Sequence, residues 1–332
     1  MATPTPELFG SPHPAISVIL PVLNEESHLE DAVHSILSQD YHGAIEVILA
    51  VGPSHDRTLE IAQSISRRDP RVVIVENPSG RTAAGLNLAL HTSQSPVVVR
   101  VDGHAQIPHN YLSLVVEILN STGAVNVGGV MAAVGKTPFE KAVAGAMRSP
   151  LGVGASRFHT GGEAGVVDTV YLGAFRREAL LAIGGFDERF TRAQDWELNF
   201  RLRENGGIVY FDPRLHVTYR PRSTVKALAK QYFEYGRWRR VVSRRHAGTI
   251  NLRYLAPPVA LIGFIASVVA GIFAPILFTP AVIYLLFVLA ASLSIASSIR
   301  EYFLLLAVIP TMHFAWGAGF ISSPKTLVPA SE

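Results

Sequence analysis

The chain contains 332 residues, of which 48% are hydrophobic and 17% are charged. This composition excludes an intrinsically disordered or collagen-like chain, because a sequence this apolar can bury a core. Since cysteine is absent, disulfide and thiolate chemistry are excluded as well, which fits a reducing compartment. The formal net charge is +3, and many of the basic residues gather just ahead of an apolar C-terminal region.

Residues 1–14 are rich in proline and predict a flexible tail. From there to residue 102, short apolar runs alternate with amphipathic segments. This alternation indicates an α/β domain with a mostly parallel sheet that helices cover on both faces. The runs predict strands at 16–23, 45–51, 71–75 and 96–101, and the segments between them predict helices at 26–39, 56–67 and 82–91.

Ligands of such sheets bind beyond the carboxyl ends of the strands, which directs attention to Asn24, Glu25 and Asp102. A dinucleotide-binding fold requires a glycine-rich turn after its first strand. Here residues 23–27 read Leu-Asn-Glu-Glu-Ser and contain no glycine. The sequence therefore disfavours a Rossmann-type dehydrogenase and favours a nucleotide whose phosphates are held in another way.

The fourth predicted strand leads into Asp102, Gly103 and His104. A carboxylate and an imidazole two residues apart can bind one divalent cation, and Mg²⁺ or Mn²⁺ accepts these donors. Such a cation offsets the charge of a departing diphosphate. The alternative is a simple turn in which Asp102 caps the backbone and His104 is solvated.

Two later segments also attract attention. Residues 151–165 include five glycines, which predicts either a lid over bound substrates or a plain surface loop. Further along, Asp195 is expected in the first turn of a helix. A carboxylate at that position either caps the helix or acts as a general base in a cleft.

The C-terminal region lacks charge over most of its length. No charged residue occurs in 257–299, and only Arg300 and Glu301 precede a second uncharged run at 302–324. The first run is long enough for two membrane spans, at 254–278 and 281–299. The second run crosses, re-enters or tilts, because proline and glycines weaken it. A buried helical hairpin in a soluble protein is the alternative.

A basic stretch stands directly before the first of these helices, and no acidic residue balances it. Cytoplasmic flanks of membrane helices are enriched in Lys and Arg, so we expect residues 1–253 on the cytoplasmic side, with no signal peptide. Membrane lipids are expected partners; a merely solvated helix is the alternative, and nucleic acid is disfavoured. The stretch contains Arg237, Arg239, Arg240, Arg244, Arg245, His246 and Arg253.

Four motifs follow one another in order: Pro-Val-Leu-Asn-Glu-Glu at 21–26, Asp-x-His at 102–104, Gly-Gly-Phe-Asp at 184–187 and Gln-Asp-Trp-Glu-Leu at 194–198. Together they resemble the family-2 glycosyltransferases, which are inverting enzymes of the GT-A fold using nucleotide-diphosphate sugars. Residues 99–105, 173–177 and 231–236 are similar to the branch of succinoglycan-type exopolysaccharide enzymes. The resemblance covers residues 15–246 and implies a Rossmann-like GT-A sheet followed by membrane helices.

The resemblance also implies roles for the residues that match the family's motifs. Asp195 is implied as the catalytic base. The donor is implied to contact Pro21, Asn24, Glu25, Asp56, Arg81 and Asp102. Acceptor or diphosphate contacts are implied for Gln194, Trp196, Gln231, Arg237 and Trp238. The metal, Mn²⁺ or Mg²⁺, is implied at Asp102 and His104, with His216 as a further candidate.

Three departures from the family pattern qualify these roles. Residues 51–58 lack the usual base-reading aspartate, although Asp56 is present, so the preference for uridine is open. Gln194 replaces a glutamate ahead of the base. Five residues separate Gln231 from Arg237, where processive enzymes have two. With only two or three membrane helices, the chain is expected to add one sugar and not to extrude a polymer.

The sequence therefore predicts a membrane-anchored transferase that moves a sugar, with a UDP-sugar as the expected donor, to a hydroxyl of a polyprenyl-linked or glycan acceptor. A polyprenyl-phosphate sugar synthase and a non-catalytic nucleotide-sugar-binding scaffold are the alternatives. The predicted division of the chain is a tail at 1–14, a catalytic domain at 15–220, basic interface helices at 221–253, a membrane region at 254–322 and a tail at 323–332.

Overall fold

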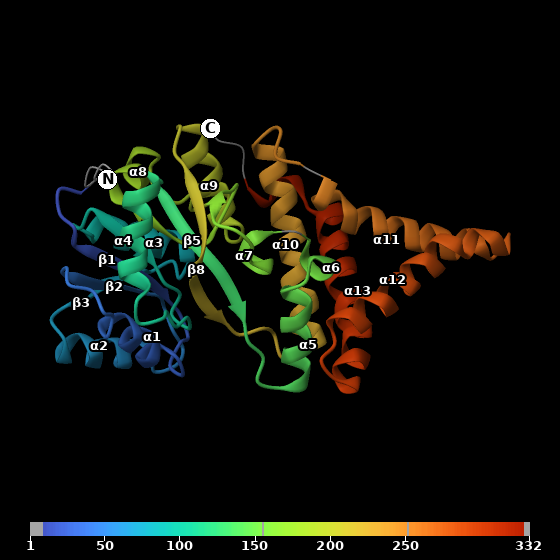
Figure 1. Ribbon diagram of the computed structural model, residues 1–332, viewed down its shortest axis with the longest axis horizontal. Helices are drawn as coiled ribbons and strands as arrows, with labels where there is room; N and C mark the ends of the chain where they lie inside the picture. The colour runs from blue at the N-terminus through green and yellow to red at the C-terminus, as the bar shows by residue number, and fades with distance from the viewer. Residues whose placement is uncertain (1–8, 155, 251, 329–332) are drawn as a thin grey trace, which may run out of the picture. The chain divides into compact units, whose positions relative to one another are not determined.

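The computed structural model describes residues 9–154, 156–250 and 252–328, and they form two compact units (Figure 1). Unit 1 comprises the described residues up to Ala132 together with Gly161–Thr218. Unit 2 comprises Ala133–Thr160 and the residues from Tyr219 onward. Residues 133–160 thus cluster with the C-terminal helices although they lie inside the predicted 15–220 domain; the functional boundaries of the domains stay a prediction.

An eight-stranded sheet organises unit 1, in the order β3-β2-β1-β4-β7-β5-β8-β6. Strands β1 to β4 are parallel, and β7 is antiparallel between β4 and β5. This mostly parallel mixed sheet with flanking helices confirms the predicted fold class. The strands are β1 (Ile16–Val22), β2 (Ile45–Val51), β3 (Val72–Glu76), β4 (Val97–Arg100), β5 (Asn126–Ala133), β6 (Gly165–Val166), β7 (Tyr171–Arg176) and β8 (Val209–Tyr219).

The apolar run of β1 fills two cores at once. Val18 and Leu20 face one buried cluster, whereas Ile19 faces the other. Alternate residues of a strand point to opposite faces, so helices on both faces require an unbroken apolar strand. The covering helices of unit 1 are α1 (Leu29–Leu37), α2 (Thr58–Arg68), α3 (Thr82–Thr92), α4 (Tyr111–Thr122), α8 (Arg177–Ala182) and α9 (Gln194–Glu204).

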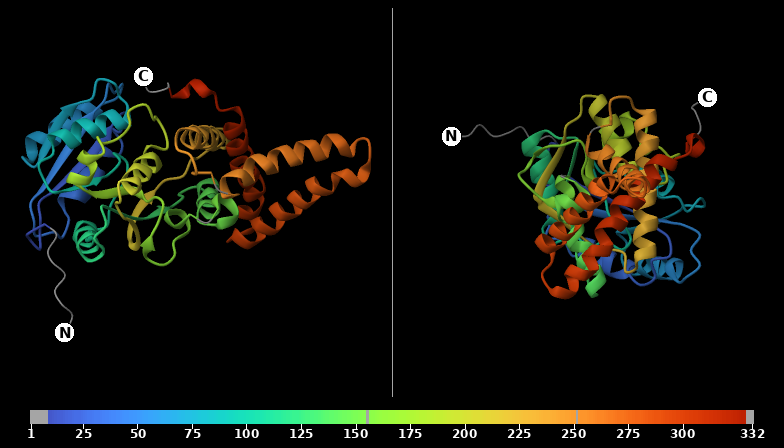
Figure 2. Two further views of the ribbon diagram at one scale, coloured as in Figure 1. Left: turned by 90° about the horizontal axis from the view of Figure 1, so that it is seen from above. Right: turned by 90° about the vertical axis from the view of Figure 1, so that its right-hand side faces the viewer.

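Unit 2 is built from helices, two of which leave the others as a hairpin (Figures 1 and 2). Ser267 Oγ in the first arm donates a hydrogen bond to Leu277 O of the connecting turn at 2.6 Å and accepts one from Ala281 N of the second arm at 3.1 Å, which ties the two arms together. The helices are α5 (Pro138–Met147), α6 (Pro150–Val153), α7 (Arg157–Thr160), α10 (Val225–Arg245), α11 (Leu252–Gly271), a 3₁₀ turn at Pro275–Phe278, α12 (Thr279–Ile295), α13 (Ile299–Ser322) and a 3₁₀ turn at Lys325–Leu327.

The segment predicted as a lid or surface loop, 151–165, overlaps most of the short helix α6, contains α7 and ends at the first residue of β6. Residue 155 lies outside the described residues. Within the described part, Ser149 caps α6 by accepting a hydrogen bond from Leu151 N at 3.2 Å. Its role as a lid stays a prediction.

Candidate functional site

The carboxyl ends of β1 and β2 are joined by hydrogen bonds between their following loops. Asn24 has a φ of 57°, a left-handed conformation that asparagine tolerates better than most residues. Its Oδ1 accepts a hydrogen bond from His55 N at 2.8 Å. Glu25 N donates to Thr58 Oγ1 at 2.7 Å. Hydrogen bonds therefore join the Asn-Glu motif to the 52–58 loop at the carboxyl ends of β1 and β2.

Asp56 organises this edge through its own carboxylate. Its Oδ1 accepts from Thr58 N at 3.0 Å, and its Oδ2 accepts from Glu26 N at 3.2 Å. The hydrogen bond from the Thr58 hydroxyl lowers the pKa of Asp56 below its ordinary value. Asp56 therefore holds the start of α2.

The end of β4 carries an arginine that joins two of the predicted functional acids. Arg100 is 6% exposed. Its Nε and Nη2 donate to Oδ1 of Asp102 at 3.1 and 3.0 Å, and its Nη1 donates to Oδ1 of Asp195. One guanidinium thus brings together the predicted metal-binding acid and the predicted base.

Asp195 is held in the first turn of α9 by an unusual backbone. Ala193, just before this helix, has a φ of 58°, which costs energy for a residue with a Cβ. Burial raises the pKa of Asp195; the charge of Arg100 opposes this rise and the charge of Asp102 adds to it. The side chain remains 32% exposed. Asp195 is therefore both more basic than an ordinary aspartate and accessible from solvent.

Arg100 stays charged in this arrangement. Burial by itself lowers the pKa of Arg100, but the charges of Asp102 and Asp195 outweigh it and raise the pKa above its usual range. A buried cation needs such partners, because an isolated charge is costly to remove from water. Arg100 was not among the sequence-predicted site residues. The signal that could have found it is an arginine within a run of valines, since a charged residue in a buried strand needs partners of opposite charge.

His104 contacts the Asn-Glu motif. Its Nδ1 lies 2.7 Å from Oε1 of Glu25, so an acid from the first motif orients the imidazole. Within the described ranges no group of three or more His, Asp or Glu side chains suited to a metal is found. His216 on β8 has its Nδ1 3.2 Å from Arg214 O. Among the described residues, His216 does not form a metal-binding group with Asp102 and His104.

Two protein donors nevertheless fit a cation that is shared with a diphosphate. Oδ1 of Asp102 receives both hydrogen bonds from Arg100, whereas Oδ2 accepts none from the residues that the structure describes. Mg²⁺ and Mn²⁺ sites complete their coordination with water and substrate phosphates. The carboxylate and imidazole at 102–104 therefore match the donor chemistry of such an ion.

Hydrogen bonds from α9 and from α3 hold the Gly-Gly-Phe-Asp turn, Arg201 lying on α9 and Asn87 on α3. Arg201 pairs with the buried Glu197 at 2.7 Å and donates to Ile183 O and Gly185 O at 2.7 and 2.8 Å. Asn87 Nδ2 donates to Phe186 O at 2.8 Å. The Gly-Gly-Phe-Asp turn therefore helps to position α9, the helix that carries the predicted base. Neither Glu197 nor Asn87 was among the sequence-predicted site residues.

The remaining predicted contacts are distributed over both units. In unit 1, Gln194 is buried, and Trp196 stacks on Phe200 with ring centroids 5.9 Å apart. Arg81 is the residue immediately before α3, and Pro21 pairs in register with Ala50.

Three predicted acceptor or diphosphate contacts belong to α10 in unit 2. Gln231 Nε2 donates to the hydroxyls of Tyr219 and Tyr235, both at 2.7 Å. Arg237 pairs with Glu234 at 2.9 Å, and Trp238 is buried. Their role toward an acceptor stays a prediction.

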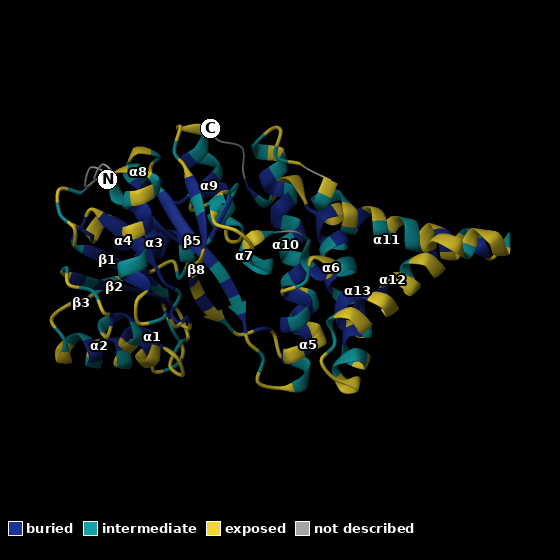
Figure 3. Ribbon diagram, in the orientation of Figure 1, coloured by how far each residue is buried: buried dark blue, intermediate teal, exposed yellow. Residues whose placement is uncertain are grey.

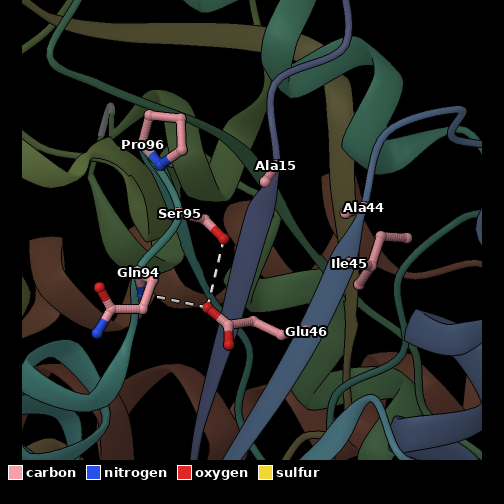
Figure 4. Close-up of a pocket in the computed structure, with 7 residues that line it drawn as sticks. All are labelled: Ala15, Ala44, Ile45, Glu46, Gln94, Ser95 and Pro96. Carbon is pink, nitrogen blue, oxygen red and sulfur yellow. Dashed lines mark hydrogen bonds between the residues drawn. The ribbon is translucent and has the colours of Figure 1, made fainter.

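A cavity of about 310 Å³ lies at the amino ends of β1 and β2, the edge of the sheet opposite the acids (Figure 4). Glu46 Oε1 accepts there from Gln94 N at 3.2 Å and from Ser95 Oγ at 3.3 Å. These bonds tie β2 to the segment that precedes β4. Because ligands of parallel sheets bind at the other edge, we interpret Glu46 as structural.

The model of the glycosyl transferase family 2 matches residues 17–184. The succinoglycan biosynthesis protein ExoA of Rhizobium meliloti (strain 1021) is 33% identical over 317 residues, which are 91% of this chain and 93% of that protein. A dolichyl N-acetyl-alpha-D-glucosaminyl phosphate 3-beta-D-2,3-diacetamido-2,3-dideoxy-beta-D-glucuronosyltransferase of Methanococcus voltae is 23% identical, over 77% of this chain and 82% of that protein.

A solved structure shares the fold of the chain. The mannosyltransferase PcManGT from Pyrobaculum calidifontis, in complex with GDP-Man and Mn²⁺, aligns with a TM-score of 0.65 and 21% identity. The alignment covers 94% of this chain and 87% of that one.

Proposed function

Because the chain belongs to glycosyltransferase family 2, which confirms the resemblance found in the sequence, we propose that it transfers one sugar, with inversion, from a nucleoside-diphosphate donor to a hydroxyl of a lipid-linked glycan. The observation that carries this proposal is the convergence of Asp102 and Asp195 on Arg100. An inverting transfer needs a base near the acceptor and charge compensation near the diphosphate. These two acids supply candidates for both tasks within one unit.

The proposed roles follow from the chemistry of the side chains. Asp195 accepts the proton of the acceptor hydroxyl, whose oxygen attacks the anomeric carbon from the face opposite the diphosphate. Asp102 and His104 hold Mg²⁺ or Mn²⁺, which when bound supplies positive charge beside the diphosphate. Asn24 and Glu25 position the nucleoside. Arg100 keeps both acids in place by pairing with them.

The nature of the acceptor is supported by the relatives. One is named for succinoglycan biosynthesis, and another for transfer to a dolichyl-linked sugar phosphate. The second name describes addition to a sugar that a lipid already carries, so it favours a hydroxyl acceptor over a bare lipid phosphate. A polyprenyl-phosphate sugar synthase would instead form a lipid-linked sugar monophosphate.

A donor screen tests the proposal. The full chain is incubated with single nucleotide sugars, Mn²⁺ or Mg²⁺ and extracted lipid acceptors, and release of nucleoside diphosphate is measured. We expect one donor to be consumed only when acceptor and cation are both present, with inverted anomeric configuration in the product. A product of retained configuration would contradict the proposed mechanism, and a sugar monophosphate lipid would favour the synthase.

The pH dependence of transfer should report the environment of Asp195. Because burial raises its pKa, Asp195 takes up a proton at a higher pH than an ordinary aspartate. The protonated form is no base, so kcat/KM should fall as the pH drops through this raised pKa and recover above it. A pH–rate profile at fixed Mn²⁺ measures this. A rate that stays constant down to about pH 4, the ordinary aspartate range, would contradict a raised pKa for the base.

Three helices of unit 2 are long and apolar enough to cross a membrane. In α11 and in the segment that contains α12, 17% and 22% of the apolar window is buried, against 39% in α13. Figure 3 accordingly shows the hairpin arms largely exposed. An α11 of 20 residues is about 30 Å long, which matches the hydrocarbon thickness of a bilayer. We propose that the α11–α12 hairpin enters the membrane.

We assign α13 to the surface of the membrane because it packs directly on the basic helix α10. A Cβ on Gly236 would lie 2.0 Å from Trp316 O, and a Cβ on Gly319 would lie 2.0 Å from Phe233 O. The guanidinium of Arg240 lies 5.0 Å from the ring centroid of Phe320.

An α13 that crossed the bilayer would carry the arginines of α10 with it. Each charged residue costs about 3 kcal/mol at the centre of a bilayer, whereas each contributes about 1 kcal/mol of attraction beside anionic lipid. The surface position is therefore favoured. Helix α10 carries Arg237, Arg239, Arg240, Arg244 and Arg245.

Cysteine labelling tests this topology. The chain has no cysteine, so each introduced cysteine reports one position. Ser223→Cys precedes α10, Phe273→Cys marks the exposed hairpin tip, and Thr326→Cys follows α13. We expect a membrane-impermeant maleimide to label 223 and 326 from the cytoplasmic side and 273 from the opposite side. Labelling of 326 from the side of 273 would show that α13 crosses.

A further inference from the structure

Unit 2 contains a second cavity, of about 250 Å³, at the base of the apolar hairpin. It lies where the connection from α12 to α13 meets the exposed side of α5. Polar and apolar side chains share its wall. The lining includes Lys141, Gly145, Arg148, Ile295, Ser297 and Glu301.

Lys141 and Gly145 of α5, together with Arg148 directly after this helix, line one side of the cavity. Lys141 and Arg148 are seven residues apart, which is nearly two helical turns, so both project from the same side. Gly145 stands between them, and a Cβ there would lie 3.0 Å from Ile295 Cγ2. The glycine therefore lets the chain near Ile295 approach α5 and leaves space between the two cationic side chains.

The charges of the cavity favour an anion. Within the described ranges, neither Lys141 nor Arg148 forms an ion pair, and Arg148 Nη1 is held by Ala133 O at 3.1 Å. Glu301 is the one acid among the lining residues. Its Oε2 accepts from Ser297 N at 3.0 Å, so this carboxylate already serves the start of α13.

The position of the cavity suggests where the anion comes from. If the α11–α12 hairpin enters the bilayer as proposed above, Ile295 at the end of α12 and Ser297 just after this helix lie at the level of the lipid headgroups. The apolar side chains of Val134 and Leu305 also line the cavity. A phosphate between two cations with apolar surface beside it is the chemistry of a phospholipid headgroup.

We propose that this cavity binds the phosphate of an anionic phospholipid from the cytoplasmic leaflet. The site is separate from Asp102, Arg100 and Asp195, which belong to unit 1. Lys141 and Arg148 pair with the phosphate, while Ile295 contacts the glycerol region. The bound lipid fixes α5 to the base of the hairpin and so stabilises unit 2. The proposal rests on the proposed membrane placement.

The test uses the purified full chain in a neutral detergent and follows thermal unfolding by tryptophan fluorescence. Dioleoylphosphatidylglycerol is added to one sample, dioleoylphosphatidylcholine to a second, and inorganic phosphate at the same concentration to a third. Because a ligand that binds only the folded state raises Tm, we expect phosphatidylglycerol to raise Tm by about 3 °C or more. The other two additions should leave Tm unchanged.

Matched variants locate the effect. Lys141→Gln/Arg148→Gln should lose the Tm rise, whereas Lys226→Gln/Lys230→Gln, which removes the same charge from exposed positions on α10, should keep it. Lys141→Glu provides a second test in case the double variant folds poorly. It changes a single exposed side chain and should also abolish the Tm rise. An equal loss in both double variants, or a rise with inorganic phosphate alone, would overturn the proposal.

Donor-dependent release of nucleoside diphosphate, measured on the same preparations, separates this proposal from the proposed function. Activity without a response to phosphatidylglycerol would contradict the lipid site alone. A response without activity in the wild-type chain would contradict the transferase function alone.

Discussion

Replacing Asp195 with asparagine should lower the turnover of sugar transfer by about 1,000-fold and leave donor binding nearly intact. Asparagine has the same shape and retains an oxygen that can accept the hydrogen bond from Arg100 Nη1, but it cannot take up the acceptor's proton. The loss should therefore appear in kcat, and the KM for the donor should change little. Turnover from nucleoside diphosphate release and donor affinity from calorimetry measure the two effects.

A neighbouring substitution provides the control for Asp195→Asn. Glu204 stands at the other end of α9 and is exposed, so Glu204→Gln removes one negative charge from the same helix without touching Arg100. Its turnover should match that of the wild-type chain. If Asp195→Asn retained near-normal turnover, Asp195 would be the partner of a buried arginine and not a base.

Replacing Asp102 with asparagine should reduce kcat/KM by about 1,000-fold, because a cation beside the leaving group contributes several kcal/mol to transition-state stabilisation. The variant should also require far more Mn²⁺ for half-maximal activity. His104→Gln should give a smaller change of the same kind, since an amide oxygen remains a weak ligand. Titration of activity with Mn²⁺ measures both.

Asp102 has two roles in this account, as a ligand of the cation and as the partner of Arg100. Arg100→Lys separates them. Lysine keeps one charge but cannot reach both acids with a planar fork, so turnover should fall while the Mn²⁺ midpoint stays near that of the wild-type chain. An Asp102→Asn variant with an unchanged Mn²⁺ midpoint would show that Asp102 serves only as a partner of Arg100.

The parallel half of the fold could be predicted because its signals are local. The strands at 16–22, 45–51, 72–76 and 97–100 were all expected, since strands covered on both faces need uninterrupted apolar side chains. The insertion of β7 between β4 and β5 was not predicted. Antiparallel pairing between distant segments leaves no periodic trace in the sequence.

The site was predicted less completely than the fold. Motif spacing predicted roles for Asp102 and Asp195 but gave no sign that Arg100 would pair with both. The contact between His104 and Glu25 joins residues that are 79 positions apart, and only the folding of two loops onto one sheet edge creates it. Residues 133–160 belong to unit 2 because of how their helices pack. The sequence of α5 by itself does not predict this packing.

The most direct test of the account is the position of a bound cation relative to the two acids. Crystals of the full chain with Mn²⁺ and the nucleoside diphosphate of its donor would locate the metal by anomalous scattering. The account predicts Mn²⁺ at about 2.1 Å from a carboxylate oxygen of Asp102, with the carboxylate of Asp195 facing the same bound nucleotide. A cation coordinated without Asp102, or a nucleotide bound away from Asp195, would contradict it.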